Sequence, residues 1–391
     1  MNLHPLKKSF WPLAIVVNCV LPVANASAYT ATSIGASAVN TSPVGGSSKY
    51  ADINQNGRVV WTHSNGSSVW VPGTGRVDLT MSVVTNAYPQ TTDYRGHFAS
   101  AINDSNIVVG AGDVITQQGC ITLMQTRGCS WSPSGNGYGS PTMHSADYYG
   151  AVGFDGINNS NLVVASFAWH EQYDHHVETY DGSDYTTNSF PGGAEGMQGV
   201  GINDAGQVVG TCWDLVVDYY PYVTNYNAFV GDVRLGYIAV SGSSSGESFG
   251  NAVNEYGIAV GEWTTDVSPR RAFIWIPDSA NGTTATNFAM KALGELTGET
   301  SSVAFGVGNV SVDGQGVYTV KVVGTCGNKA VLWTVQFEPG DSNSFSPSIT
   351  DLSGEAGAGI TLTAAFDIND DGDIAAGGTS GGSSYTYLLE P

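Results

Sequence analysis

The segment Gly201-Ile-Asn-Asp-Ala-Gly-Gln-Val-Val-Gly210 contains the pattern from which most of this chain is built. Apolar residues alternate with polar ones on both sides of a short polar centre, which is typical of two half-buried β-strands. Asn, Asp and Gly at the centre favour a tight turn, because these residues tolerate the positive φ angles that hairpins need. The segment therefore predicts one β-hairpin.

The same pattern returns along the chain. The aliphatic residue before the Asn position recurs at intervals of 45 to 61 residues, at Ile53, Ile102, Ile157, Ile202, Val253, Val307 and Ile368. The sixth copy, Ala304 to Gly324, is degenerate. A third apolar segment with an aromatic residue follows most hairpins, as at Ala272 to Pro277, and a weaker fourth segment comes after it. Four short strands in each of seven units of this length indicate the blades of a β-propeller.

The two ends of the repeat region complement each other. The last copy has its hairpin and a third strand, Tyr385 to Leu389, but no fourth. Near the N-terminus, Ala31 to Gly35 resembles a fourth strand with no hairpin before it. Pairing the two would leave no open sheet edge. We therefore expect an all-β, seven-bladed β-propeller closed by this pairing, as a single domain over residues 29–391; the alternative is an open β-solenoid.

Residues 1–28 match the three parts of a secretory signal peptide. Lys7 and Lys8 form the positive region, Phe10 to Ala24 the apolar region, and small residues follow at a cleavage site. The apolar run is too short and too rich in proline for a membrane anchor, and no later stretch reaches the length of a membrane span. The sequence thus predicts a secreted or periplasmic protein without membrane insertion.

The cysteines after the signal admit two interpretations. Cys120 and Cys129 are nine residues apart and could form a disulfide that closes a loop in an oxidising compartment. Cys212 and Cys326 both follow Val-Val-Gly-Thr, which predicts equivalent buried positions in two repeats and no bridge between them. Zinc binding is the rival interpretation, but no Cys-x-x-Cys pair is present.

The composition narrows the classes of partner. The chain has 13 Lys and Arg against 34 Asp and Glu, a net charge of −21, so a basic face for nucleic acid is not expected. Hydrophobic residues make up 41% of the chain, which is enough for a sizeable core. The charge favours a neutral ligand, and it restricts an acidic one to the adjacent Arg270 and Arg271. We expect a monomer.

The repeat pattern, Ala-x-x-Ile-Asn-x-x-Gly-x-Val-Val-Gly followed by Ala-Phe-x-Trp, resembles the extracellular HAF-type repeat of bacterial secreted proteins. The hairpin half of the pattern matches well, but Arg271, Asn227 and Lys329 stand where the family has the His of His-Ala-Phe. The resemblance implies a secreted, propeller-like bacterial protein. It implies no activity, so function has to be argued from candidate sites.

The loops after Val-Val-Gly in copies two to five differ from the short hairpin turns. They are long and rich in aromatic, His and charged residues, and we expect them on one face beside the channel. Aromatic rings stack on sugars, and polar side chains bind sugar hydroxyls and carboxylates, so this face predicts binding of an extracellular glycan or another cell-surface ligand. The predicted ligand-binding residues are Trp169, Trp213, Asp214, Tyr219, Tyr222, Trp263, Arg270 and Arg271.

The alternative function is a polysaccharide lyase. A His would act as base, a Tyr as acid, and an Arg would neutralise a uronate carboxylate. The catalytic candidates are His144, His170, His175, Tyr148 and Tyr220. A hydrolase with two carboxylates is a further option, with Glu171, Asp174 and Asp214 as candidates. A purely structural role in a matrix or envelope is the third, so the sequence leaves open whether the protein is an enzyme.

No cofactor is expected. Zinc could bind His170, His175 and His176, but their spacing is not a familiar ligand pattern. Asp367 to Asp373 resembles the start of a calcium loop, yet the acidic residue required at position 12 is replaced by Gly378. In the other copies, Asn, Asp and Gly at the same positions are explained by the formation of the hairpin turn.

Overall fold

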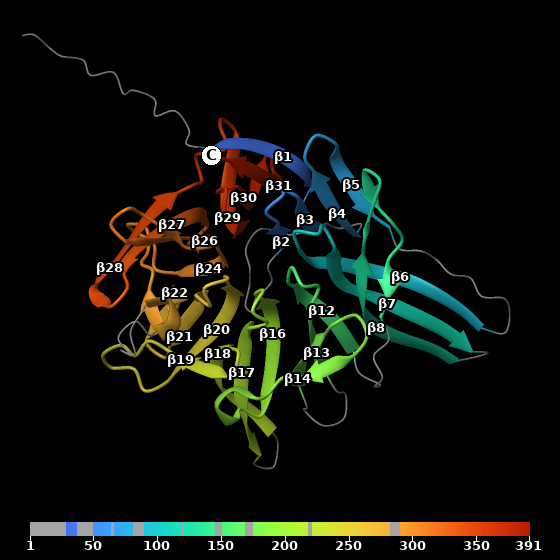
Figure 1. The fold of residues 1–391 in the computed structure, drawn as a ribbon, viewed down its shortest axis with the longest axis horizontal. Coiled ribbons are helices and arrows are strands. Elements are labelled where there is room, and N and C mark those ends of the chain that lie inside the picture. Colours follow the sequence, from blue (N-terminus) through green and yellow to red (C-terminus); the bar gives the residue numbers. More distant parts are fainter. Residues whose placement is uncertain are drawn as a thin grey trace, which may run out of the picture.

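The computed structural model describes residues 29–36, 50–63, 66–80, 90–118, 121–144, 151–168, 175–217, 221–281 and 290–391. Its strands form seven antiparallel blades around a central channel, so the protein is a seven-bladed β-propeller (Figure 1). The predicted fold class is confirmed.

In each blade the strands follow one another from the channel outward. The first blade contains β2 (Ala51–Ile53), β3 (Val59–His63), β4 (Gly66–Val71) and β5 (Gly75–Leu79). The second contains β6 (Gln90–Ile102), β7 (Val108–Gln118), β8 (Ile121–Trp131) and β11 (Thr142–Met143), beside the small hairpin β9 (Pro133–Ser134) and β10 (Gly137–Tyr138). The third contains β12 (Ala151–Ile157), β13 (Val163–Ala168), β14 (His175–Tyr180) and β15 (Tyr185–Thr187).

The remaining blades have the same order. The fourth contains β16 (Gly196–Ile202), β17 (Val208–Val217), β18 (Pro221–Val230) and β19 (Val233–Gly236), and the fifth β20 (Gly246–Val253), β21 (Ala259–Thr265), β22 (Ser268–Trp275) and β23 (Met290–Ala292). The sixth contains β24 (Ser302–Val307), β26 (Tyr318–Cys326), β27 (Lys329–Glu338) and β28 (Asp341–Asp351), with β25 (Ser311–Val312) also paired to β26. Two short helical turns are present: Pro191–Gly193 lies between the third and fourth blades, and α1 (Asp278–Asn281) lies between β22 and β23 of the fifth blade.

The seventh blade joins the two ends of the chain. It contains β29 (Ile360–Ile368), β30 (Ile374–Ser380), β31 (Ser383–Glu390) and, as its outer strand, β1 (Thr30–Ala36). Ala31 is paired with Leu389 in antiparallel register, and Ile34 of β1 is 3% exposed in the adjoining core. The predicted closure is confirmed, and the alternative of an open solenoid is excluded.

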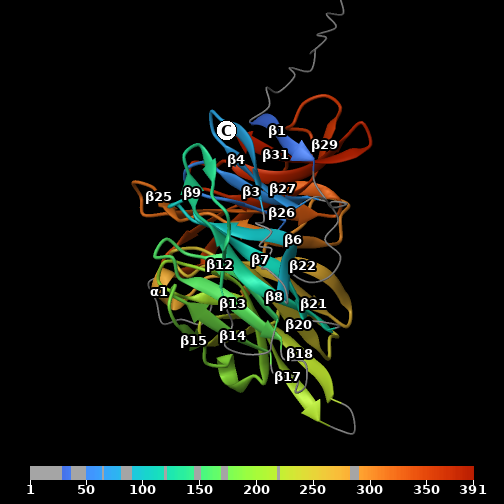
Figure 2. The ribbon, with the colours of Figure 1, turned by 90° about the vertical axis from the view of Figure 1, so that its right-hand side faces the viewer.

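The third strands deliver aromatic residues to the core, as expected. Trp131, Phe229, Phe273 and Trp333 are all at most 1% exposed. Large rings buried between neighbouring blades account for much of the apolar area removed from water. The long strands β6 to β8 and β17 to β18 project beyond the ring (Figure 1, Figure 2).

The Asn of each hairpin turn stabilises its own turn and contacts the next blade. In the third blade, Oδ1 of Asn158 accepts the N–H of Leu162 at 2.9 Å, while Nδ2 donates to the carbonyl oxygen of Asn203 at 3.0 Å. Asn54, Asn103, Asn203, Asn254 and Asn369 also donate Nδ2 to a carbonyl oxygen of the following blade. The degenerate sixth copy has Gly308 at this position, and so lacks the side chain.

A second set of hydrogen bonds closes completely around the ring. The residue after the Asn position accepts the backbone N–H of its counterpart in the preceding blade. The seven residues in this ring are Gln55, Asp104, Asn159, Asp204, Glu255, Asn309 and Asp370. The polar residues that the sequence analysis assigned to turn formation therefore also hold the blades together.

The segment that resembles a calcium loop belongs to this arrangement. Oδ1 of Asn369 accepts the N–H of Asp373 at 2.8 Å, and Oδ2 of Asp367 accepts the N–H of Ile53 at 3.1 Å. Hairpin-turn and inter-blade hydrogen bonds thus account for these residues.

The cysteines correct one prediction and confirm another. Cys129 is a free, buried thiol in β8, and burial raises its pKa to about 12, so the predicted disulfide is wrong. Its proposed partner, Cys120, lies outside the described residues. The strand from Ile121 to Cys129 is extended and spans about 27 Å, at about 3.4 Å per residue. This length is far greater than the Cα separation of two disulfide-bonded cysteines. Cys212 and Cys326 are both buried and free, as predicted.

The described residues contain no helix long and apolar enough to cross a membrane. The predicted signal segment, residues 1–28, lies outside them.

Candidate functional site

A β-bulge recurs in the innermost strands of blades two to seven, and in the seventh its extra residue, Phe366, is buried in the core. The strand register shifts at the same point of the repeat in β6, β12, β16, β20 and β24. In these five strands the extra residue of each bulge lies three positions before the Asn position and is Ser100, Asp155, Val200, Asn251 or Phe305. A bulge redirects a side chain that regular pleating would point elsewhere. All five residues line one cavity in the central channel.

The glycine of Val-Val-Gly is explained by this bulge. Gly210 is paired with Gly199 beside the bulge of the fourth blade, and a Cβ atom added to Gly210 would lie 2.0 Å from the carbonyl oxygen of Gln198. Gly261 has the same close approach, at 1.9 Å from the carbonyl oxygen of Phe249. The motif glycine therefore makes room for the strand that carries the channel-lining residue.

The cavity has a volume of about 460 Å³, within the range of small-molecule sites. Ile157, Ile202 and Val253, which directly precede the turn Asn residues, line its lower part. The same residues also line a smaller cavity of about 170 Å³ on the hairpin-turn side. The residues shared by the two cavities are thus mostly apolar, with Asp52 as the charged exception.

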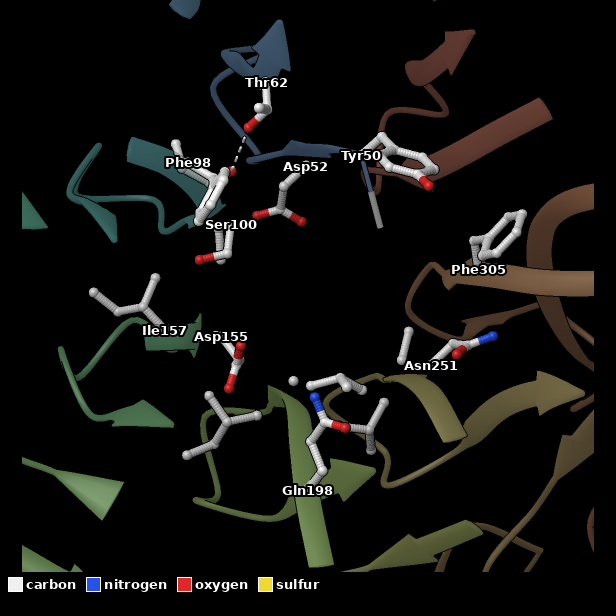
Figure 3. A pocket seen from close by; sticks show the side chains of 18 residues that line it. Tyr50, Asp52, Thr62, Phe98, Ser100, Asp155, Ile157, Gln198, Asn251 and Phe305 are labelled. Carbon is white, nitrogen blue, oxygen red and sulfur yellow. Dashed lines mark hydrogen bonds between the residues drawn. The ribbon is translucent and has the colours of Figure 1, made fainter. Parts of the chain in front are cut away.

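The walls of the cavity combine aromatic and polar side chains. Tyr50 and Phe98 supply accessible rings, whereas Phe305 is 2% exposed and packs on Phe366 in the core. The polar lining residues are Asp52, Thr62, Ser100, Asp155, Gln198 and Asn251 (Figure 3). Phe98 is 56% exposed, so its ring is accessible at the cavity. Among the described residues, no Lys, Arg or His lines this cavity.

Asp155 has an unusual environment. Burial raises the pKa of its carboxyl to about 7, and hydrogen bonds from Ser166 offset part of that effect. Its Oδ2 is buried and has no hydrogen-bond partner in the described part of the protein. Such an acceptor is costly to leave unsatisfied. Because the atom has no exposed surface, the cost falls on stability and the atom is not open to a ligand in the cavity.

Asn251 provides a second unsatisfied acceptor. Its side chain is 7% exposed, and Nδ2 donates to the carbonyl oxygen of Ala304 at 2.8 Å. This bond fixes the orientation of the amide, so the buried atom left without a partner among the described residues is Oδ1. Asp52 differs from both, because its Oδ2 accepts the N–H of Ile102 at 2.8 Å.

Trp213 and Trp263, the two predicted tryptophans within the described residues, do not form a sugar-stacking surface. Trp263 is 1% exposed in the core between the fourth and fifth blades. Trp213 is 8% exposed, covers Gly196 and contacts the ring of His175 at 5.5 Å. Their role as exposed ligand-binding residues is therefore corrected to a structural one, since a buried ring cannot stack on a ligand.

The predicted charged residues are engaged in ion pairs. Asp214 forms a bidentate pair with Arg234, at 2.8 and 2.9 Å. Arg270 contacts the buried Glu262 at 2.6 Å, and Arg271 lies 3.6 Å from Glu295. The two arginines already have carboxylate partners within their own blade, so the expectation that they bind a uronate is not supported.

His144 has a different tyrosine partner from those expected. Its Nδ1 lies 3.2 Å from the hydroxyl of Tyr180, and its Nε2 lies 2.9 Å from Oγ of Ser130. Burial lowers the pKa of His144. The histidine therefore joins the second and third blades, and neither Arg270 nor Arg271 contacts it in the pairs described above.

The other predicted residues cannot be placed. Trp169, His170, Glu171, Asp174, Tyr148, Tyr219 and Tyr220 lie outside the described residues, and only the backbone of Tyr222 is described. The loop of the fifth copy is short, because Thr265 pairs directly with Ser268. The expected expansion in copies two to five is thus wrong for copy five.

The zinc hypothesis does not fit β14. His175 and His176 are successive strand residues, so their side chains point to opposite faces. His175 contacts Trp213, whereas His176 stacks on Phe167 and lies 3.3 Å from Glu178. The described residues contain no group of three or more His, Cys, Asp or Glu that could hold a metal ion.

The sequence analysis missed the channel cavity. The signal was present at the position three residues before the Asn, where five copies carry Ser, Asp, Val, Asn and Phe, with small residues on both sides in all but the Asp155 copy. The bulge that directs it into the channel has no signature that alternation alone could show.

Comparisons with known proteins do not identify a function. No family model and no curated protein matches the sequence. A chain of the mitotic checkpoint complex is 8% identical with a TM-score of 0.40, and the match covers 99% of this chain and 98% of the other. A glucose dehydrogenase (9% identical, TM-score 0.38) and the soluble aldose sugar dehydrogenase of Escherichia coli (11%, 0.37) each match over 93% of this chain and 99% of their own. Similarity at this level supports no statement about ligand or activity, and the fold assignment rests on the strand pairings.

Proposed function

We propose that this protein is a glycan-binding β-propeller whose binding site is the central-channel cavity. The observation that supports the proposal most is the channel cavity itself, which exposes the ring of Phe98 together with the side-chain amide of Gln198. Sugars offer hydroxyl groups to a side-chain amide and C–H faces to aromatic rings. This proposal keeps the ligand class expected from the sequence and moves the site from the loops to the channel.

The lyase alternative has less support. It needs a His, a Tyr and an Arg around one uronate carboxylate. His144 contacts Tyr180, while Arg270 and Arg271 are paired with Glu262 and Glu295. The described residues do not bring the three types of side chain together.

We also propose that the chain is exported by its N-terminal signal and acts outside the cytoplasm as a monomer. The arrangement of Lys7, Lys8 and the apolar run that follows supports export. The resemblance to the HAF-type repeat is consistent with such a location. Export would bring the protein into contact with extracellular or periplasmic glycans.

A carbohydrate array followed by calorimetric titration tests the proposed binding. The discriminating variant is Phe98→Ala, which removes an exposed ring from the cavity. Its matched control is Tyr256→Ala. Tyr256 is 41% exposed and lies in a hairpin turn, on the opposite face of the propeller from Phe98. We expect Phe98→Ala to weaken binding about tenfold or more, as loss of a stacking ring does, and Tyr256→Ala to leave it unchanged. No binding to any glycan, or equal effects of both variants, would reject the proposal.

A further inference from the structure

A second cavity lies where the ring closes, between the first and seventh blades, which lie side by side (Figure 1). It has a volume of about 390 Å³ and shares no lining residue with the channel cavity. We call it the closure cavity. The hairpin turns of both blades, the strand β1 and the ends of β4 and β31 contribute to its walls, and its lining residues include Thr32, Gln55, Trp70, Asp371, Asp373 and Glu390.

One position of the repeat differs at this junction. The residue after the positive-φ turn residue is Arg58, Ile107, Leu162, Gln207, Ile258, Val317 or Asp373 in blades one to seven. In the fourth blade this side chain packs on the turn of the fifth, because Oε1 of Gln207 lies 3.0 Å from a Cβ atom built on Gly257. Oδ2 of Asp373 faces Gly57 of the first blade in the same way, at 3.7 Å, but this side chain is shorter and charged. Such a break in an otherwise regular pattern is expected at functional positions.

Trp70 is the aromatic residue of the closure cavity. Its counterparts in the second and sixth blades are Trp131 and Trp333, and each of the three is paired with the first valine of Val-Val. Trp131 and Trp333 are 0% exposed, and their Nε1 atoms donate to the carbonyl oxygens of Thr80 and Gly294, at 3.3 and 3.1 Å. Trp70 is only half-buried, and its Nε1 makes no hydrogen bond to another described residue. The ring is therefore available to a ligand where its counterparts are sealed in the core.

The charged groups around Trp70 are carboxylates. Asp371 and Glu390 are exposed, and their side chains make no hydrogen bond or ion pair with another described residue. Asp373 is half-buried, and its Oδ2 accepts Nδ2 of Asn369 at 3.1 Å. The described residues that line the cavity include no Lys, Arg or His. A solute with a negative charge would therefore be repelled.

A neutral saccharide fits this combination best. Its C–H face stacks on an indole ring, and its hydroxyl groups donate to carboxylates. The exposed carboxylates remain hydrated, so they do not by themselves require a cation. We propose that the closure cavity is a second saccharide site, which holds a neutral sugar unit against Trp70 with its hydroxyl groups donating to Asp371, Asp373 and Glu390. The site lies on the hairpin-turn side and is independent of the proposed channel site.

The repeat itself supplies a variant that fills the closure cavity. Asp373→Ile gives the seventh blade the side chain that the fifth blade has in Ile258, so the turn can accommodate it. Its matched control is Gln207→Ile in the fourth blade, which lies outside the closure cavity. Both changes remove an acceptor for the turn Asn, since Oδ2 of Asp373 accepts from Asn369 at 3.1 Å and Oε1 of Gln207 accepts from Asn203 at 2.9 Å. Melting curves establish that each variant is folded.

The experiment is calorimetric titration of the full chain with four neutral disaccharides: cellobiose, maltose, lactose and mannobiose. All proteins carry Phe98→Ala, which removes the ring of the proposed channel site. We expect at least one disaccharide to bind, Asp373→Ile to weaken that binding about tenfold or more, and Gln207→Ile to leave it unchanged. No binding of any of the four, or equal weakening by both variants, would overturn the inference. Binding of tetramethylammonium chloride without binding of a disaccharide would also overturn it, because the cavity would then accept an organic cation.

The two proposed sites can fail separately. If Phe98→Ala leaves glycan binding unchanged and Asp373→Ile abolishes it, the channel site is rejected and the closure site stands. If Phe98→Ala abolishes glycan binding and Asp373→Ile has no effect, the closure site is rejected and the channel site stands.

Discussion

The side-chain amide of Asn103 donates from Nδ2 to the main-chain oxygen of Asn158 in the next blade, at 3.0 Å. The other atom of the same amide, Oδ1, accepts the N–H of Ile107 within its own turn at 2.9 Å. One buried side chain thus serves both the hairpin and the ring. Because the bond is repeated around the channel, the blades are held together at the hairpin-turn side, below the cavity.

Replacement of Asn103 by Ala should destabilise the protein by about 2–4 kcal/mol, because it leaves one buried donor and one buried acceptor unpaired. The measurement is the melting temperature, followed by circular dichroism. Ser105→Ala, an exposed change in the same turn, should leave the melting temperature within experimental error. A small effect of Asn103→Ala would contradict the importance of the inter-blade bond.

The gap in the Asn series predicts a stabilising substitution. A Cβ atom added to Gly308 would lie 3.8 Å or more from its nearest neighbours, among them the carbonyl oxygen of Asn369 at 3.9 Å. The Gly308→Asn side chain could therefore donate to the next blade as the other Asn residues do. We expect a gain of about 1 kcal/mol from this bond and from the lower entropy of the unfolded chain. A lower melting temperature than that of the unchanged protein would show that the sixth blade cannot accommodate an Asn side chain at this position.

Closure of the ring by β1 can be tested at Ile34. Ile34→Asp places a carboxylate in the buried core beside the strand and should cost at least about 3 kcal/mol. Detachment of β1 would also expose the edge of β31, so self-association by size-exclusion chromatography is expected. Ser33→Asp, at the preceding exposed position, should have little effect. A monomeric, fully stable Ile34→Asp protein would contradict closure by this strand.

The pKa of Asp155 predicts how stability changes with pH. Its value in the folded protein, about 7, lies above the ordinary value of 3.8, so between these values the folded state binds more protons than the unfolded state. The contribution of this group to stability therefore falls as pH rises through that range, and the penalty is complete above about pH 7. Asp155→Asn removes it. The melting temperature of the variant minus that of the unchanged protein should be larger at pH 8 than at pH 5. A constant difference would contradict the raised pKa.

Sequence alone could predict the architecture because the information is local and repeated. The alternation around Ile202 and its counterparts defines the hairpins, and the unpaired strand near Ile34 matches the missing strand of the last blade. These features depend on backbone periodicity and turn chemistry, which single segments encode.

The site could not be predicted in the same way, because side-chain direction depends on partners that are distant along the chain. Asp214 pairs with Arg234, and Arg271 with Glu295, so residues that looked available for a ligand are already neutralised. Trp263 looked like a loop aromatic but lies in β21 and is buried. Conversely, Asp155 was not singled out, because its burial and its hydrogen bonds from Ser166 depend on the neighbouring strand.

The most direct test of the central claim is a crystal structure of the protein with the tightest-binding saccharide. The account predicts electron density for the sugar in the channel cavity, with a hydrogen bond to the amide of Gln198 and ring contact with Phe98. Density for the sugar on the outer blades, for example near Trp213, with none in the channel, would contradict it.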